Sequence, residues 1–447
     1  MRLFLGTLLT VASLAVGAAD ALAAGFYLQE QSVKGQGAAN AGIGANPQDA
    51  STIFFNPAGL TELSGPTIEA GAAVLVPSTK FSNGGSTAGL TALLPGGQAA
   101  YGGNNGGNAF DITAIPSMYA AAPIPGQDGK YWLGLGINSP FGLADEYNDG
   151  WFGRYDSTSS ALTTIEISPV IAMRVNNRLS LGGGPSFQHA DAKLTAALPC
   201  PNAGFGCGAA FTPATDGTSR LEGSSWATGF HAGALWKFDD KTNIGVNYRS
   251  AMTQGVVGSV TVAGLGGALA ANNGVRAATA NLEMPDTFGL SVAHDFSPQL
   301  KLLGSANFFD WSDFKEIRVS FLNGDPDQVT PENFEDTFSV AFGGEWKQNE
   351  NLTFRGGLQF DQTPTNDTDR GTRIPDGDRL WVSAGFSYNV NQRFSIDGAF
   401  THIFIDDADM NLNKRIYEGT PADTTVRLRG SAESRVEIIS LHAKLKF

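Results

Sequence analysis

Most of the chain is built from short segments in which apolar and polar residues alternate. In the clearest one, at the C-terminal end, five apolar residues alternate with four polar ones: Ile439, Leu441, Ala443, Leu445 and Phe447 against Ser440, His442, Lys444 and Lys446. Segments 352–361 and 380–390 repeat the pattern. Alternation of this kind is typical of half-buried β-strands. The pattern therefore predicts an all-β structure from about residue 67 onward.

The connections decide between a soluble sandwich and a barrel, because both would alternate. Short polar connections fall at 176–177, 239–240, 297–298, 348–351 and 391–392. Between them lie long ones, at about 78–108, 143–160, 196–222, 263–275, 322–333, 364–377 and 414–430. Tight periplasmic turns alternating with long external loops are typical of transmembrane β-barrels, which have an even number of strands in bacteria. We expect residues 67–447 to form an antiparallel barrel of about 14 strands.

The first 23 residues carry the features of an export signal. A charged Arg2 precedes an apolar stretch, and Ala21-Leu22-Ala23 is a small-residue cleavage site. After it, no run approaches the ~18 apolar residues of a membrane helix. These features place the protein in the outer membrane of a Gram-negative bacterium, as a multi-pass barrel. The net charge of -14 excludes nucleic acid as a partner, since nucleic-acid binding needs a basic surface.

Aromatic residues support the barrel. We expect Tyr131, Trp132, Trp236, Trp346 and Trp381 to form the girdles found at both membrane interfaces. The alternative for these side chains is an ordinary place in the core. The chain also ends on an aromatic residue at the end of the last strand, which suits recognition by the barrel assembly machinery.

Residues 24–66 precede the first strand and contain the stretch FFNPAGL. Pro57 and Gly59 exclude a strand interior, and two adjacent Phe exclude a solvated linker. A barrel of about 14 strands is too wide for its own side chains to fill. We therefore expect residues 24–66 to form a hatch inside the lumen, with Phe54 and Phe55 buried there and with Asn56, Pro57 and Ala58 near the barrel wall. Asn56 should hydrogen-bond there, because a buried amide must be satisfied.

The chain resembles the long-chain fatty-acid and hydrocarbon transporters of the outer membrane (FadL/TodX type, OMPP1). The resemblance rests on the start AGF, on NPAGL, and on five further stretches: PFGLADEY (140–147), GFHAGALWKF (229–238), NYRS (247–250), WSDF (311–314) and IPDGDRLWVSAG (374–385). It covers essentially the whole mature chain. It implies a 14-stranded barrel with an N-terminal hatch. Substrates would be captured at external loops, held in an inner pocket and released sideways through a kinked third strand.

The third predicted strand contains a fitting interruption. It begins KYWLGLGIN and then meets Pro140, which lacks the N–H that a ladder needs, and Gly142, which weakens the strand further. We assign Pro140, Phe141, Gly142 and Ala144 to the lateral gate that the resemblance implies. The alternative is an ordinary strand end that enters a loop.

The resemblance also implies basic residues that hold a substrate carboxylate. The position after the W-S-x-F stretch is Arg318, which we expect to face the lumen. The second position is occupied by Ala196, with Lys193 as the nearest base. Only one of the two basic residues that the resemblance implies is therefore present at its expected position. Gly25 and Phe26, in the AGF start, complete the predicted substrate-binding set. The alternative for Arg318 is an ion pair with Glu316 or Glu345.

Other chemistry is weakly supported. Cys200 and Cys207 lie in one predicted external loop, and export favours a disulfide over two free thiols. The five histidines show no zinc-binding spacing, and no nucleotide-binding or nucleophile-elbow motif occurs, so we expect no metal, no cofactor and no catalytic residue. The acidic run 405–411 is read as a solvated rim rather than an ion site.

The predicted function is passive uptake of hydrophobic molecules, with long-chain fatty acids first and aromatic or aliphatic hydrocarbons second. External loops such as 90–95 and 263–271 are rich in apolar residues, which is a liability unless they bind something. An outer-membrane lipase is a rival, but no nucleophile, base and acid can be assembled. An adhesin barrel is another, and it would lack hatch and kink. Expected partners are the substrate, the outer membrane with its lipopolysaccharide, and the assembly machinery, for a monomeric protein.

Overall fold

A computed structural model describes residues 25–94 and 97–447, and the predicted export signal, 1–23, lies outside the described residues. The helical elements are α2 (Val33–Gly37), α3 (Thr52–Phe55), η1 (Pro57–Glu62), η2 (Thr91–Leu93), η3 (Ala203–Phe205), η4 (Gly267–Asn272) and η5 (Trp311–Asp313). None of the helices in these two ranges is long and apolar enough to cross a membrane.

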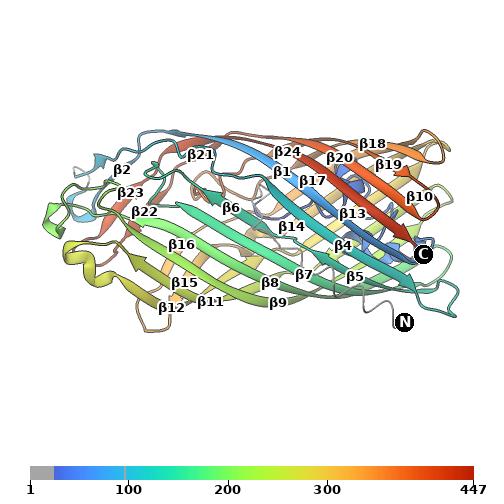
Figure 1. The fold of residues 1–447 in the computed structure, drawn as a ribbon, viewed down its shortest axis with the longest axis horizontal. Coiled ribbons are helices and arrows are strands. Elements are labelled where there is room, and N and C mark those ends of the chain that lie inside the picture. The colour runs from blue at the N-terminus through green and yellow to red at the C-terminus, as the bar shows by residue number, and fades with distance from the viewer. Residues whose placement is uncertain (1–24, 95–96) are drawn as a thin grey trace.

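The strands form one large closed sheet (Figure 1). Its twenty segments are β1 (Thr67–Asn83), β4 (Thr113–Pro123), β5 (Tyr131–Asn138), β6 (Gly142–Glu146), β7 (Ser159–Arg174), β8 (Leu179–Leu198), β9 (Gly217–Lys237), β10 (Thr242–Arg249), β11 (Met252–Ala263), β12 (Gly274–Met284), β13 (Thr287–Asp295), β14 (Leu300–Phe309), β15 (Glu316–Phe321), β16 (Gln328–Pro331), β17 (Thr337–Lys347), β18 (Leu352–Asp361), β19 (Arg379–Asn389), β20 (Phe394–Ile405), β21 (Ala408–Met410) and β24 (Gly430–Lys446). A small second sheet contains β2 (Thr87–Leu90), β3 (Ala99–Ala100), β22 (Asn413–Ile416) and β23 (Thr424–Arg427).

Fourteen barrel strands result, because six of them are each interrupted once. The pairs of segments are β5/β6, β10/β11, β12/β13, β14/β15, β16/β17 and β20/β21. The sheet is antiparallel, and it closes where β1 pairs with β24 on one side and with β4 on the other. The predicted fold class, a 14-stranded antiparallel barrel, is confirmed. The five short connections predicted from the sequence all fall between consecutive strands at one end of the barrel.

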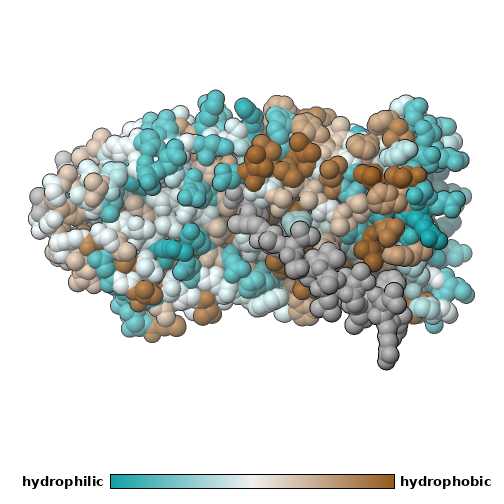
Figure 2. Space-filling model, viewed as in Figure 1, coloured by the Kyte–Doolittle hydropathy of each residue, from teal (hydrophilic) through white to brown (hydrophobic). Residues whose placement is uncertain are grey.

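The membrane-facing part of the wall is apolar outside and polar inside. On β24, Ile439, Leu441 and Leu445 are exposed, while Ser440 and His442 are buried against the lumen. The same arrangement occurs on β13, β17, β18 and β19. Apolar patches gather over the half of the barrel that carries the C-terminal end, and polar residues dominate toward β2 and β23 (Figure 2). An outward apolar band of this kind matches the hydrocarbon region of a bilayer.

The aromatic residues predicted as girdles divide into two groups. Trp236 and Trp346 face outward, each one residue before the end of its strand. Trp381 and Trp132 are buried, with exposed fractions of 1% and 3%. The girdle prediction is therefore wrong for these two. On β19, Trp381 lies two residues before Ser383 and therefore on the same face of the strand. Because the Ser383 side chain faces the lumen, Trp381 also points inward.

The interruptions in the barrel strands align across four neighbours. Arg249, the last residue of β10, pairs with Thr287 of β13. Thr287 pairs on its other side with Phe309 of β14, and Phe309 pairs in turn with Thr337 of β17. Just beyond these residues lie the irregular segments 250–251, 285–286, 310–315 and 332–336. The outward apolar band ends at the same level, at Phe308 and Phe338. The breaks thus separate the membrane-embedded half of the barrel from an extracellular half.

Polarity inverts across this boundary. On β8, Leu181 and Phe187 face lipid and Gln188 faces the lumen, whereas further along Lys193 faces outward and Leu194 lies toward the interior. The outer surface of the extracellular half meets water, so its polar residues point out. Its apolar residues are left to line the inside of the barrel.

Residues 25–66 fill the lumen as a hatch. In FFNPAGL, α3 ends at Phe55, and Asn56 caps η1 by accepting a hydrogen bond from the Ala58 N–H at 3.2 Å, with Pro57 at the first helical position. Asn56 is fully buried, and its amide donates to the carbonyls of Gly44 at 2.7 Å and Ala234 of β9 at 3.0 Å. The motif therefore joins the hatch to itself and to the wall.

Glycines in the wall make this contact possible. A Cβ at Gly233 would lie 2.1 Å from Asn56 Oδ1, and one at Gly245 would lie 2.0 Å from the carbonyl oxygen of Gly44. Atoms cannot approach so closely, so any larger residue would push the hatch away from β9 and β10. Residues of the hatch and glycines of the wall therefore together determine where the hatch lies.

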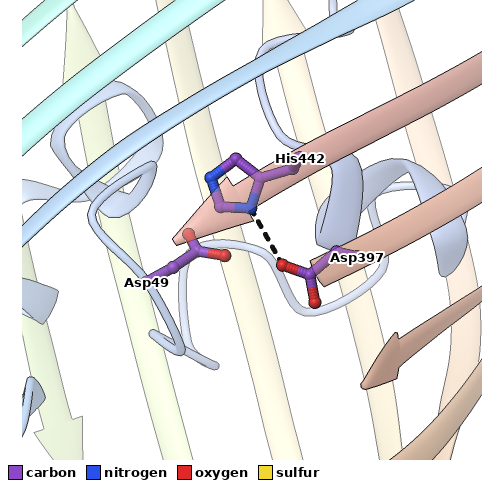
Figure 3. A group of neighbouring side chains, drawn as sticks. All are labelled: Asp49, Asp397 and His442. Carbon is purple, nitrogen blue, oxygen red and sulfur yellow. Dashed lines mark hydrogen bonds and ion pairs between the residues drawn. The ribbon is translucent and has the colours of Figure 1, made fainter. Parts of the chain in front are cut away.

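Buried charges anchor the hatch to the seam of the barrel (Figure 3). Lys34 Nζ lies 3.3 Å from Asp49 Oδ2 in the hatch and 3.8 Å from Asp397 Oδ2 on β20. His442 of β24 places Nδ1 2.8 Å from Asp397 and Nε2 3.4 Å from Glu69 of β1. Both ring nitrogens face carboxylates, which only a doubly protonated imidazolium satisfies as donor.

Asp49, Asp397 and His442 could together hold a metal ion, because their ligand atoms lie within 4.8 Å of one another. The Lys34 ammonium already supplies the cation at the two carboxylates. The group therefore acts as an ion-paired anchor.

The external loops pack over the open end of the barrel. Cys200 and Cys207 form a disulfide with their Cα atoms 6.1 Å apart, within the usual range. Both are buried in an apolar cluster with Leu221, Val260 and Leu265. The bridge thus fixes the loop after β8 against the neighbouring strands and the loop after β11.

Replacing Lys34 by Met should loosen the hatch. It leaves Asp49 buried without its ion-pair partner, a change that costs about 3–5 kcal/mol in other buried pairs, while Asp397 keeps His442. Hydrogen exchange at residues 33–51 should become faster while the barrel strands keep their protection. Lys34→Met combined with Asp49→Asn should restore much of the protection, because it removes the carboxylate that lost its partner. Lys80→Met, on the outer face, should change nothing. Unaltered exchange in Lys34→Met would show that the anchor lies elsewhere.

The disulfide should resist alkylation in protein isolated without reductant. Closing so short a loop contributes about 2–3 kcal/mol in the chain-entropy account. Reduction, or Cys200→Ser with Cys207→Ser, should therefore increase protease cleavage between residues 199 and 216. Alkylation of both thiols in unreduced protein would contradict the bridge.

Candidate functional site

An apolar cavity of about 570 Å³ lies inside the extracellular half of the barrel. Its wall is built by inward-facing aliphatic residues of successive strands: Leu143, Leu162, Leu194, Leu221, Val256 and Leu282. Phe26 of the hatch, Phe314, Ile317 and Ile374 also line it. Polarity inversion explains the cavity, since these strands turn their apolar faces inward.

Phe26 forms the floor of the cavity. Its ring lies 4.8 Å from that of Trp311, 5.3 Å from Phe314 and 5.9 Å from Phe141, measured between ring centroids. Trp311 and Phe314 belong to the WSDF stretch, which occupies the break between β14 and β15. The irregular backbone there turns both aromatic side chains into the lumen. The breaks therefore supply a rigid aromatic support beneath the cavity.

The wall is incomplete next to this aromatic cluster. The β4–β5 ladder ends at the pair Met118–Ile137, and within the described sheet β6 pairs with β7 alone. The hatch bonds to the interruption instead: Leu28 N–H donates to the Pro140 carbonyl at 2.8 Å, and Gly142 N–H donates to the Phe26 carbonyl at 3.0 Å. The predicted gate residues thus lie at a break in the wall that the hatch closes from inside.

Gly142 and Ala144 both lie in β6, and Leu143 between them lines the cavity. Phe141 is buried and contacts both Phe26 and Tyr27. The cavity therefore borders the interrupted third barrel strand directly.

Two charged residues, Arg373 and Glu332, line the otherwise apolar cavity. Arg373 comes from the long loop after β18. Its guanidinium donates to the hydroxyl of Ser160 at 2.8 Å, to that of Ser157 at 3.3 Å and to the carbonyl of Asp156 at 2.7 Å. All three acceptors are neutral, and within the described ranges no carboxylate forms an ion pair with Arg373.

Glu332 occupies the break between β16 and β17, beyond the outward apolar band, and is 8% exposed. Burial, helped by the nearby Asp156, outweighs the opposite effect of Arg373 and Lys414, and together these effects raise the pKa of Glu332 to about 8. Among the described residues no hydrogen bond to the Glu332 carboxyl group forms, while its backbone carbonyl accepts one from the Asn366 side chain at 3.5 Å. Near neutral pH its carboxyl group is thus mostly protonated.

The predicted basic residues do not reach the cavity. Arg318 alternates with Ile317 and Val319 as expected, but Ile317 lines the cavity and Arg318 faces outward. Its guanidinium pairs with Glu316 at 2.7 Å and with Asp327 at 3.2 Å. The expected lumenal orientation is wrong, because β15 lies in the extracellular half, where apolar side chains point in.

Lys193 faces outward for the same reason, since its neighbours Ala192 and Leu194 line the cavity. Phe26 lies where the prediction placed it. Gly25 lies outside the cavity lining; its N–H donates to Asp376 Oδ2 at 3.1 Å, and its φ of +61° favours glycine. Sequence reasoning missed Arg373 and Glu332, which lie in irregular segments without a period. The quoted stretch IPDGDRLWVSAG begins one residue after Arg373.

A second cavity, also of about 570 Å³, lies between the hatch and β9, β10, β13 and β14. Phe54 and Phe55 line it together with Asn247 and Asn307. The Arg249 guanidinium stacks 4.3 Å above the Phe54 ring and pairs with Glu166 at 2.7 Å. Its mixed lining contrasts with the apolar lining of the first cavity.

Known proteins of similar sequence are outer membrane proteins, and several of them are long-chain fatty acid transport proteins. The chain is 30% identical over 421 residues to the long-chain fatty acid transport protein of Escherichia coli K12, spanning 88% of this chain and 91% of that protein. It is 31% identical to a putative outer membrane protein of Neisseria meningitidis serogroup B, spanning 97% of each.

Solved structures agree on the fold. A Pseudomonas aeruginosa FadL homologue superposes with a TM-score of 0.84 at 25% identity, covering 95% of this chain and all of that one. The Ralstonia pickettii toluene transporter TbuX superposes at 0.62 with 18% identity, over 92% of this chain and 97% of that one, which supports the fold alone.

The profile of the outer membrane protein transport protein family (OMPP1/FadL/TodX) matches residues 14–447. Members of this family are transport channels rather than enzymes. With its plugged 14-stranded barrel and its apolar inner cavity, the chain belongs to this family and is an outer-membrane channel for the uptake of hydrophobic molecules.

Proposed function

We propose that this channel takes up long-chain fatty acids. The cavity behind Phe26 carries the proposal: it is almost wholly apolar, it lies inside the extracellular half, and it borders the broken third barrel strand. Apolar external loops would collect the substrate, and the cavity would then exclude water from its chain. The related fatty acid transporters support this choice of substrate.

Release would occur sideways into the membrane. A hydrophobic molecule that reaches a polar lumen would gain nothing by continuing to the periplasm, because the hatch fills the barrel with buried polar and charged groups. The break at residues 139–141 lies beside the cavity and has no neighbouring strand on the β4 side of β6. Phe26 and Leu28 hold the break by backbone hydrogen bonds, so their displacement would open the route.

Aromatic or aliphatic hydrocarbons are the second candidate. The observation that favours them is the outward orientation of Arg318 and Lys193, which removes both bases expected to hold a carboxylate. Without these two bases, Arg373 is the one basic side chain in the described lining that could favour an acid over a neutral molecule. The two substrates therefore differ in whether a charged group inside the cavity contributes to binding.

Further partners are proposed from the architecture. Above the apolar band the outer face carries charged residues, which would meet lipopolysaccharide. Within the described residues the barrel sheet closes where β1 pairs with β24, so it has no open end to pair with a second copy, which favours a monomer.

The protein purified in mild detergent should carry lipophilic molecules. Mass spectrometry of an organic extract should find straight-chain fatty acids enriched over a control barrel prepared from the same membranes. Because the cavity is apolar and partly closed, the ligand should exchange slowly. Enrichment of neutral hydrocarbons alone would favour the second candidate.

Gly142→Trp should block uptake of labelled fatty acid and leave the barrel folded, because the indole would occupy the break beside the cavity. Gly304→Trp is the matched control: it lies on β14, and a Cβ there would come no closer than 3.9 Å to any neighbour. Folding is checked by resistance of the barrel to unfolding in detergent. Normal uptake by Gly142→Trp would exclude this break as the exit.

A further inference from the structure

The two charged residues of the cavity are the only feature there that distinguishes an acid from a hydrocarbon within the described lining. Arg373 is held in place by three neutral acceptors, so its hydrogen bonds fix the guanidinium without neutralising it. A partly buried cation lacking a counter-ion is costly. An anion entering the cavity would supply the missing charge.

We propose that Arg373, together with Glu332, receives the carboxylate head group of the substrate at the cavity. The inference rests on the proposed uptake of fatty acids and assigns the head-group site to two residues on irregular segments. The carboxylate would accept hydrogen bonds from the Arg373 guanidinium and from the protonated carboxyl group of Glu332. The alkyl chain would lie among the leucines of β6 to β12.

The surrounding acids are already engaged. Asp156 accepts from the N–H and the hydroxyl of Thr372 at 2.8 Å each, and it pairs with Lys414 at 3.3 Å. Arg373 donates a hydrogen bond to the Asp156 backbone carbonyl, and its charge helps to lower the pKa of the Asp156 carboxyl group without forming an ion pair with it. Asp145 accepts from Ser157 at 3.2 Å and lies within electrostatic range of Arg373. Neither acid therefore forms an ion pair with the guanidinium.

Glu332 makes the site sensitive to pH. The charged groups that face it are Arg373, Asp156, Lys414 and Asp369. With its pKa near 8, Glu332 is mostly protonated at pH 7 and can donate to a carboxylate. At pH 9 it is ionised, repels a carboxylate and competes for Arg373. Binding of an acid should therefore weaken from pH 7 to pH 9, although the ligand itself stays ionised throughout.

The experiment compares binding of dodecanoate with that of its methyl ester. Arg373→Gln should weaken dodecanoate binding at pH 7 roughly 10- to 100-fold, the range for a charged hydrogen bond, and leave ester binding unchanged. Glu332→Gln keeps a neutral donor, so it should bind dodecanoate at pH 7 like the native protein and lose the decline at pH 9. Arg318→Gln, on the outer face, is the matched control and should alter neither ligand.

Each other outcome overturns the assignment. Equal loss of acid and ester in Arg373→Gln would mean that Arg373 only supports the cavity wall. No loss of either would place the head group elsewhere. If Arg373→Gln fails to fold, the pH profile of Glu332→Gln still decides, and a decline at pH 9 that survives in this variant contradicts the role of Glu332. Failure of the native protein to bind dodecanoate, the ester and a neutral alkane would instead overturn the proposed function.

Discussion

The structure depends on one constraint: a single sheet must face lipid, external water and an apolar substrate along its length. In the membrane-embedded half, lipid takes the apolar side chains and the lumen keeps the polar ones. Above the outward band the surroundings become water, and the same strands turn leucines inward and lysines outward. Polarity inversion thus creates the substrate cavity without any separate domain.

The hatch solves the problem that this wide barrel creates. Its polar lumen would otherwise hold water and conduct small solutes. The hatch fills it with backbone and side-chain partners, using Asn56 against glycines of β9 and β10 and a charge cluster at the seam. These contacts are polar because the wall facing them is polar. The cavity forms only above the level at which the inner face of the wall changes from polar to apolar, and Phe26 lies at this boundary.

Irregular segments carry the specific chemistry, and regular strands carry the solvent pattern. The breaks place Trp311 and Phe314 beneath the cavity and Glu332 beside it, and the long loop after β18 brings Arg373. Only every second residue of a strand faces the lumen. Irregular backbone has no such restriction and can therefore place a charged side chain in the cavity more easily. A site of this kind can also change its residues without disturbing the ladders.

Periodicity determined the strands, because alternation is a local property that every half-buried strand must show. The sequence of short and long connections between these strands then determined the barrel. The position of the hatch was also predictable, since FFNPAGL is compatible neither with a strand nor with solvent. Only the tertiary structure decided which face of each strand looks inward. Alternation places Arg318 opposite Ile317 but does not say whether lipid or water lies outside at that height, and Trp381 was misplaced for a similar reason. Arg373 and Glu332 meet across distant, aperiodic segments, and only the folded chain brings them to one cavity.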